Sequence, residues 1–243
     1  MSRRSIWLAA LAVLAVLPAG AKAQVTMNYE YFKVQNSAAN PDFKKGIDGS
    51  IITGIVQSML GVNGLPVYTG LSGHPSLPLT QFDGTTHELQ WFTPNGSTIL
   101  ADGSGIFAGP INYTSNFFAT GESSNSNWFR TAIYRGNVNL ASASTLSFTL
   151  GADDDAWLFI DGQLVGDNGG VKGLAYTPYT TASLSAGNHS LALFFADRHE
   201  VQSALVFDPR FSVTATPEPA SLALFATGLL GFAGIARRRK RIG

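Results

Sequence analysis

Three consecutive carboxylates, Asp153 to Asp155, stand in the segment from Gly151 to Leu164, directly before a run of apolar residues. Two like charges about 4 Å apart repel by roughly 4 kcal/mol at an effective dielectric constant near 20. Three adjacent aspartates therefore need a cation, several hydrogen-bond donors or water. The residues leave two hypotheses open: a calcium site, or a tight turn in which Asp153 caps backbone amides while its neighbours are solvated.

Calcium requires more ligands than this run of aspartates offers. The ion takes six to eight oxygen atoms at about 2.3 to 2.6 Å, more than two carboxylates supply. A second loop must contribute, and the available donors are Asp167 with Asn168, or Asp197 with Glu200. An EF-hand does not match, because Trp157 stands where that loop needs Asp or Asn.

The candidates for catalysis are weaker. His199 has no partner histidine nearby in the sequence, and Arg198 beside it is expected to pair with a buried carboxylate. Asp161 and Asp167 have the residue types of a glycosidase pair, but Asp161 is better explained as a turn residue. The sequence contains no G-x-S-x-G motif and no glycine-rich phosphate loop. We expect no catalytic residues and no enzyme activity.

The elements that position these side chains are mainly strands. Apolar residues alternate over 25–31 and 145–150, the pattern of half-buried strands. Residues 156–160 are apolar on both faces, and Asp161-Gly162 after them is a hairpin signal. Strands separated by turn signals after residue 128 are typical of a β-sandwich. We expect a mainly β protein, an antiparallel β-sandwich with long loops.

One short helix is expected beside these strands. Apolar residues recur at helical spacing over 51–60, between a cap at Asp48 or Ser50 and Gly61. The β-branched residues there are also compatible with a strand. After a long loop rich in glycine and proline, the alternation of residues 86–92 predicts another strand.

The chain begins with the features of a secretory signal. Two arginines are followed by about 15 apolar residues, short of the roughly 20 that a membrane-spanning helix needs. Ala21 and Ala23 then form an A-x-A cleavage site before Gln24. We expect residues 1–23 to be removed.

The C-terminal segment 215–243 has three parts: the triplet Pro217-Glu218-Pro219, an apolar run over 220–236 that predicts a transmembrane helix, and a basic cluster over 237–241. In this combination it resembles the PEP-CTERM sorting tail of Gram-negative bacteria. The resemblance implies processing by an exosortase, with an intermediate anchored in the inner membrane before release to the cell surface or extracellular matrix.

Removing both ends leaves an acidic domain. Residues 24–216 hold eight basic and fifteen acidic side chains, whereas the whole chain is balanced at sixteen of each. A net charge of this sign disfavours nucleic acid and anionic membrane surfaces as partners. The chain has no cysteine, so disulfides and thiolate chemistry are excluded.

A further resemblance covers most of residues 29–208. The segments 153–173 and 193–207, with 41–46, 64–70 and 82–92, are similar to the fibro-slime domain of bacterial surface proteins. That domain resembles the protective-antigen-type β-sandwich, in whose lectin members adjacent aspartates bind a calcium ion that touches the sugar.

The resemblance implies that Asp153 and Asp154 are the metal pair, with weaker candidates in Asp155, Asp167 and Asp197. This chain departs from the family pattern at two places. Ala204 stands where an asparagine is usual, and Lys172 stands where a histidine is usual.

These observations predict an exported protein with a fibro-slime-like domain over 24–214. We expect a non-enzymatic, calcium-organised module that contacts extracellular polysaccharide at the surface of a Gram-negative bacterium. The alternatives are a purely structural surface protein without a metal site, and a carbohydrate-active enzyme.

Overall fold

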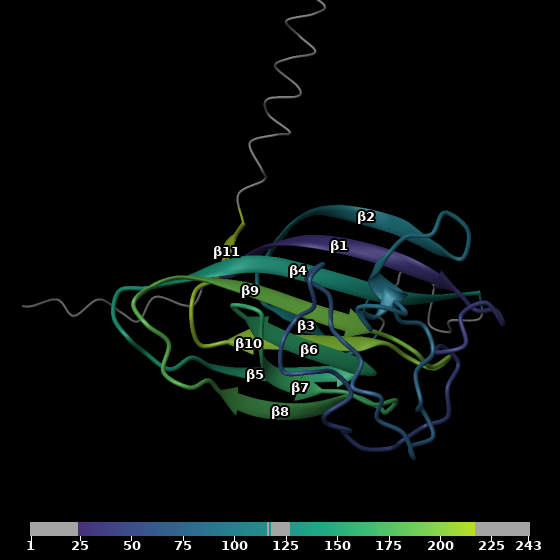
Figure 1. Cartoon of the computed structure of the whole chain (residues 1–243). Helices are drawn as coiled ribbons and strands as arrows, with labels where there is room; N and C mark the ends of the chain where they lie inside the picture. The colour runs from purple at the N-terminus through teal and green to yellow at the C-terminus, as the bar shows by residue number, and fades with distance from the viewer. Residues whose placement is uncertain (1–23, 116, 118–126, 217–243) are drawn as a thin grey trace, which may run out of the picture.

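The computed structural model describes residues 24–115, 117 and 127–216 (Figure 1). These residues form antiparallel strands and one short 3-10 helix. The strands are β1 (Thr26–Gln35), β2 (Ile99–Ala108), β3 (Ile111–Tyr113), β4 (Trp128–Leu140), β5 (Ser147–Asp153), β6 (Asp155–Ile160), β7 (Gln163–Asn168), β8 (Ala175–Thr180), β9 (Gly187–Ala196), β10 (Ala204–Pro209) and β11 (Thr214–Ala215). The 3-10 helix η1 spans Gln90–Phe92.

The strands form two sheets that pack face to face, which confirms the predicted β-sandwich. The larger sheet has the order β2-β1-β4-β9-β6-β7, with β11 beside β4. The smaller sheet has the order β3-β10-β5-β8. Figure 1 shows β10, β5 and β8 lying along the larger sheet. The chain passes directly from the small sheet to the large one between β5 and β6.

Two hydrophobic cores lie on opposite faces of the larger sheet. The first fills the space between the sheets and includes Leu158 of β6, Leu193 of β9 and Leu205 of β10. The second lies under the long loop 36–98 and includes Trp157 and Phe159 of β6. Strand β6 is therefore buried on both faces, as its continuous apolar sequence predicts.

The predicted helix over 51–60 is wrong. Its backbone amides bond to other segments and not to carbonyls four residues back: Ile52 donates to Gly169 at 2.9 Å, and Leu60 donates to Gly162 at 2.9 Å. Gly54 has a φ of +79°, which a helix does not allow. Ile55 and Val56 are buried in the second core. The apolar residues of this segment therefore reflect packing against that core and not the periodicity of a helix.

The predicted strand over 86–92 is also wrong, because the segment makes two isolated bridges and then the 3-10 helix η1. Leu89, Trp91 and Phe92 all enter the second core. Glu88 is buried instead of solvent-facing, and its carboxylate accepts hydrogen bonds from the Asn63 amide at 2.8 Å and the Thr86 hydroxyl at 2.9 Å.

The signal over 1–23 and the apolar helix over 220–236 lie outside the described residues. Among the residues that are described, no helix is long and apolar enough to cross a membrane.

Candidate functional site

The aspartate run lies at the corner where the chain changes sheets. Asp153 ends β5 in the small sheet, and Asp155 begins β6 in the large one. A cis peptide bond joins Asp153 to Asp154. All three residues are buried, with exposed fractions of 4%, 1% and 0%. The run is therefore enclosed by protein, and its charges need partners inside the fold.

Backbone amides from two loops bind the carboxylate of Asp154. Oδ1 accepts a hydrogen bond from the amide of Lys172 at 3.0 Å, and Oδ2 accepts one from the amide of Arg198 at 2.6 Å. Lys172 follows β7, and Arg198 follows β9. Asp154 thus ties the crossover between the sheets to two loops that are distant in sequence.

Asp155 forms a buried ion pair. Its Oδ2 accepts a hydrogen bond from Nε of Arg198 at 2.6 Å, and its Oδ1 accepts one from the amide of Gly170 at 2.6 Å. The Arg198 guanidinium also donates to the carbonyl of Ser76 at 3.3 Å and lies 5.0 Å from the ring centre of Trp91. The expectation that Arg198 pairs with a buried carboxylate is confirmed.

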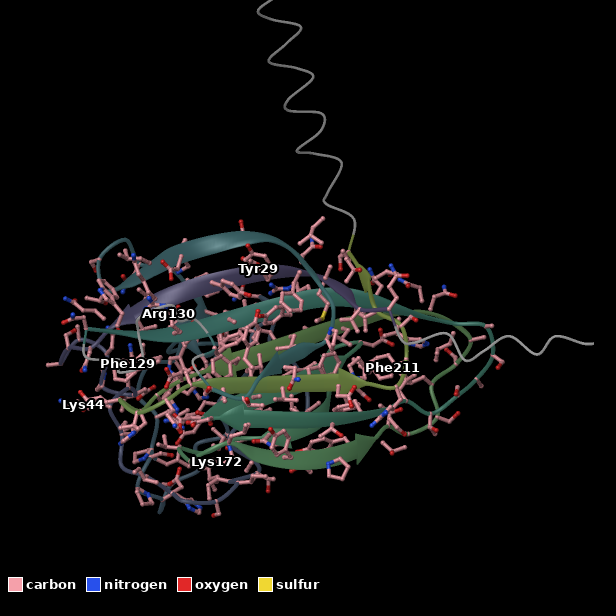
Figure 2. All side chains as sticks on the ribbon, turned by 180° about the vertical axis from the view of Figure 1, so that it is seen from behind. Tyr29, Lys44, Phe129, Arg130, Lys172 and Phe211 are labelled. Atoms are coloured by element: carbon pink, nitrogen blue, oxygen red, sulfur yellow. The ribbon has the colours of Figure 1, made fainter. Side chains whose placement is uncertain are left out.

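Lys172 brings a second buried cation to the turn. Its Nζ donates to three carbonyl oxygens, those of Asp154 at 2.5 Å, Asn168 at 3.2 Å and Gly170 at 3.3 Å. Figure 2 shows Lys172 at the end of the sandwich where Lys44 also lies. These three hydrogen bonds place the ammonium group among backbone oxygens beside the aspartates.

Burial dominates the ionisation of these groups. It raises the pKa of Asp153 to about 6, against the opposing effect of the Lys172 charge. It raises the pKa of Asp154 to about 8, and the charge of Asp155 adds to that shift. Burial also lowers the pKa of Lys172, although the neighbouring aspartates counteract it.

A cavity of about 270 Å³ opens at this corner. Asp153, Asp154 and Lys172 contribute to its lining. Ile47 and Val201 also line it and are 58% and 62% exposed. The cavity thus combines a charged, buried part with an apolar part that is open to solvent.

The structure separates the weaker metal candidates from this cavity. Asp167 accepts hydrogen bonds from the Gly54 amide at 2.7 Å and the indole nitrogen of Trp157 at 3.1 Å. Asp197 is buried at the end of β9, and its amide donates to the carbonyl of Arg130. Neither residue lines the cavity, whereas His199 does.

These residues, as placed, do not fit a calcium ion. Both oxygens of Asp154 already accept amide hydrogens, and three nearby carbonyl oxygens face the Lys172 ammonium. Among the described residues, no three His, Asp or Glu side chains are grouped to hold a metal. Calcium needs six to eight oxygens, so binding would require these contacts to rearrange. Calcium binding stays a prediction of the sequence.

The sequence predicted the aspartates but not the position of Lys172. Its carbonyl partners come from the backbone of residues 154, 168 and 170, and side-chain patterns do not reveal such partners. The available signal was the lysine itself, a basic residue in a glycine-rich loop. Asp161 is a turn residue as expected, with a φ of +49° followed by Gly162 at +76°.

Comparison with known proteins supports the C-terminal assignment. A family described as the PEP-CTERM protein-sorting motif matches residues 215–240. The motif confirms the predicted tail and indicates an exported protein that is sorted through an exosortase. Protein psiQ of Dictyostelium discoideum is 24% identical over 204 residues, which cover 74% of this chain. The match spans only 20% of the length of psiQ.

Several solved structures resemble this chain with low TM-scores and low sequence identity. The PA14 domain of the MpAFP antifreeze protein has a TM-score of 0.40 and 15% identity, over 80% of this chain and 86% of that one. The PA14 sugar-binding domain from an RTX adhesin has a TM-score of 0.35 and 19% identity, over 77% and 90%. The A domain of epithelial adhesin 9 from Candida glabrata, in complex with Galb1-4GlcNAc, has a TM-score of 0.36 and 12% identity, over 79% and 86%.

Proposed function

We propose that this protein is a non-enzymatic surface module of a Gram-negative bacterium, and that the cavity at the aspartate turn contacts extracellular polysaccharide. The domain over 24–214 is of the fibro-slime type in this proposal. The tail is processed by an exosortase after an intermediate anchored in the inner membrane. The domain then stays at the cell surface or in the extracellular matrix.

The observation that supports the ligand class is the mixed lining of the cavity. Carboxylates such as Asp153, which lines the cavity, accept hydrogen bonds from hydroxyl groups. The exposed side chains of Ile47 and Val201 offer apolar surface to the CH face of a sugar ring. A neutral polyol with one apolar face suits both parts of this lining.

The same geometry supports a binding role over hydrolysis. Glycosidases place two carboxyl groups on either side of the scissile bond, about 5 to 9.5 Å apart. Among the described residues that line the cavity, the carboxylates are Asp153 and Asp154, which are adjacent in sequence. Both oxygens of Asp154 are held by amides, so they do not present a free nucleophile opposite Asp153.

A purely structural role is the second candidate. It is favoured by the extent to which Asp154 and Asp155 are occupied by amides and by Arg198. In this alternative the turn joins the two sheets and the cavity has no ligand. The two candidates differ in one respect, which is whether a change in the cavity alters the binding of a glycan.

A glycan array of the full-length chain, purified in mild detergent, tests the proposal. We expect signals on neutral polysaccharide fragments that are lost in Asp153→Asn, while circular dichroism shows that the fold is retained. The matched control is Asp208→Asn, because Asp208 lies in another cavity, of about 360 Å³, on the small sheet. Absence of glycan signals, or signals lost in Asp208→Asn and kept in Asp153→Asn, would contradict the proposal.

A further inference from the structure

Lys172 makes as many hydrogen bonds as its ammonium group has N–H donors. A lysine ammonium has three N–H donors and no acceptor. Nζ of Lys172 donates to three carbonyl oxygens, those of Asp154, Asn168 and Gly170. Lys172 is 3% exposed, so water does not replace these acceptors. The three backbone oxygens therefore form a cradle that satisfies one buried ammonium.

The loop after β7 builds this cradle through two glycines. A Cβ atom at Gly169 would lie 2.8 Å from the carbonyl oxygen of Ile52. Gly170 has a φ of +95°, and a Cβ atom there would lie 2.8 Å from Cγ1 of Ile52. Both positions thus require glycine. The close approach of this loop to Ile52 places the carbonyls of residues 168 and 170 around Nζ.

Two cations of the chain itself lie beside the three aspartates of the turn. Arg198 pairs with Asp155 at 2.6 Å, and the Lys172 charge acts on Asp153, Asp154 and Asp155 together. Three aspartates thus face two buried cations, and both oxygens of Asp154 also accept hydrogen bonds from backbone amides. Buried carboxylates are stable only when they are paired or hydrogen-bonded. A calcium ion would add two positive charges beside an ammonium that already faces the same carbonyls.

We propose that the ammonium of Lys172 is a built-in cation that takes the place of a metal ion at the aspartate turn, so that the fold and the cavity are independent of calcium. The proposal goes beyond the proposed carbohydrate contact and does not rest on it.

Thermal unfolding of the full-length chain in mild detergent, with calcium or with a chelator, tests the proposal. The melting temperature of the wild type is expected to be the same in both media. Lys172→Gln removes the charge and leaves the three carbonyls and the aspartates without their cation. Its melting temperature is expected to fall in chelator and to recover in part with calcium. Saturation by calcium about a hundredfold above the Kd raises a melting temperature by roughly 5 to 10 °C for a domain of this size.

Two further variants complete the design. Lys44→Gln is the matched control, because Lys44 is an exposed lysine that pairs with Glu200 at 3.0 Å; it should respond to neither medium. Lys172→Arg keeps a positive charge and is expected to be more stable than Lys172→Gln and indifferent to calcium. If Lys172→Gln does not fold, folding of Lys172→Arg still supports the requirement for a charge.

Three results would overturn the proposal. The first is a wild type whose melting temperature rises with calcium. The second is a Lys172→Gln variant that is as stable as the wild type in chelator and does not respond to calcium. The third is equal loss of folding in Lys172→Arg and Lys172→Gln.

Discussion

Nε of Arg198 lies 2.6 Å from Oδ2 of Asp155, and both side chains are fully buried. This ion pair joins the end of β9 to the start of β6, and it holds the loop around Ser76 through the remaining guanidinium nitrogens. A buried charge without its partner is costly, typically about 3 to 5 kcal/mol when one member is removed.

We therefore expect Arg198→Met to lower the free energy of unfolding by about 3 to 5 kcal/mol. Urea denaturation followed by tryptophan fluorescence measures this change. The double variant Arg198→Met with Asp155→Leu removes both charges and should be more stable than Arg198→Met alone. A double variant whose loss equals the sum of the two single losses would show that the pair is not coupled.

The glycine loop beside Lys172 gives a second prediction. A Cβ atom at Gly169 would meet the backbone oxygen of Ile52 at 2.8 Å, whereas one at Gly173 would meet nothing within 4 Å. Gly169→Ala should therefore destabilise the fold by about 1 to 3 kcal/mol, and Gly173→Ala should stay within about 0.5 kcal/mol of the wild type. Equal effects of the two substitutions in urea denaturation would contradict the close approach of this loop to Ile52.

A third prediction concerns pH and a pair far from the cavity. Nδ1 of His189 lies 2.6 Å from Oδ2 of Asp161, and this hydrogen bond, helped by the carbonyl of Ser185, raises the pKa of His189. A histidine whose pKa is higher in the folded state adds stability below its unfolded value of about 6.5. That contribution is lost as the pH rises through the folded pKa.

His189→Asn should accordingly cost more stability at about pH 5.5 than at about pH 8.5. Urea denaturation of the wild type and the variant at both pH values measures the difference. His87→Asn is a control for an exchange of histidine elsewhere in the chain. A cost for His189→Asn that is the same at both pH values would contradict the role assigned to Asp161.

The pattern of apolar and polar residues predicted the strands, because successive side chains of a strand point to opposite faces and the pattern shows which faces are buried. Residues 156–160 are apolar at every position, and β6 is buried on both faces. The alternation over 145–150 likewise matches β5, where Phe148 and Leu150 enter the core between the sheets. The hairpin at Asp161-Gly162 was also predictable, since both residues adopt the positive φ that this turn needs.

Contacts between distant segments were not predictable in the same way. The spacing over 51–60 is helical, but the amides of that segment bond to residues 162 and 169. The three partners of Lys172 are backbone oxygens, which every residue carries, so no residue type marks them. The aspartate run alone was compatible with a metal or a turn. The structure adds Lys172, which follows Asp154 by 18 residues in the sequence and lies beside the run.

The most direct test of the central claim is calorimetric titration of calcium into the full-length wild-type chain after dialysis against a chelator. If Lys172 supplies the cation at Asp153 to Asp155, the titration should show only the heat of dilution. Saturable heat with a stoichiometry near one calcium ion per chain, lost in Asp153→Asn, would contradict that account.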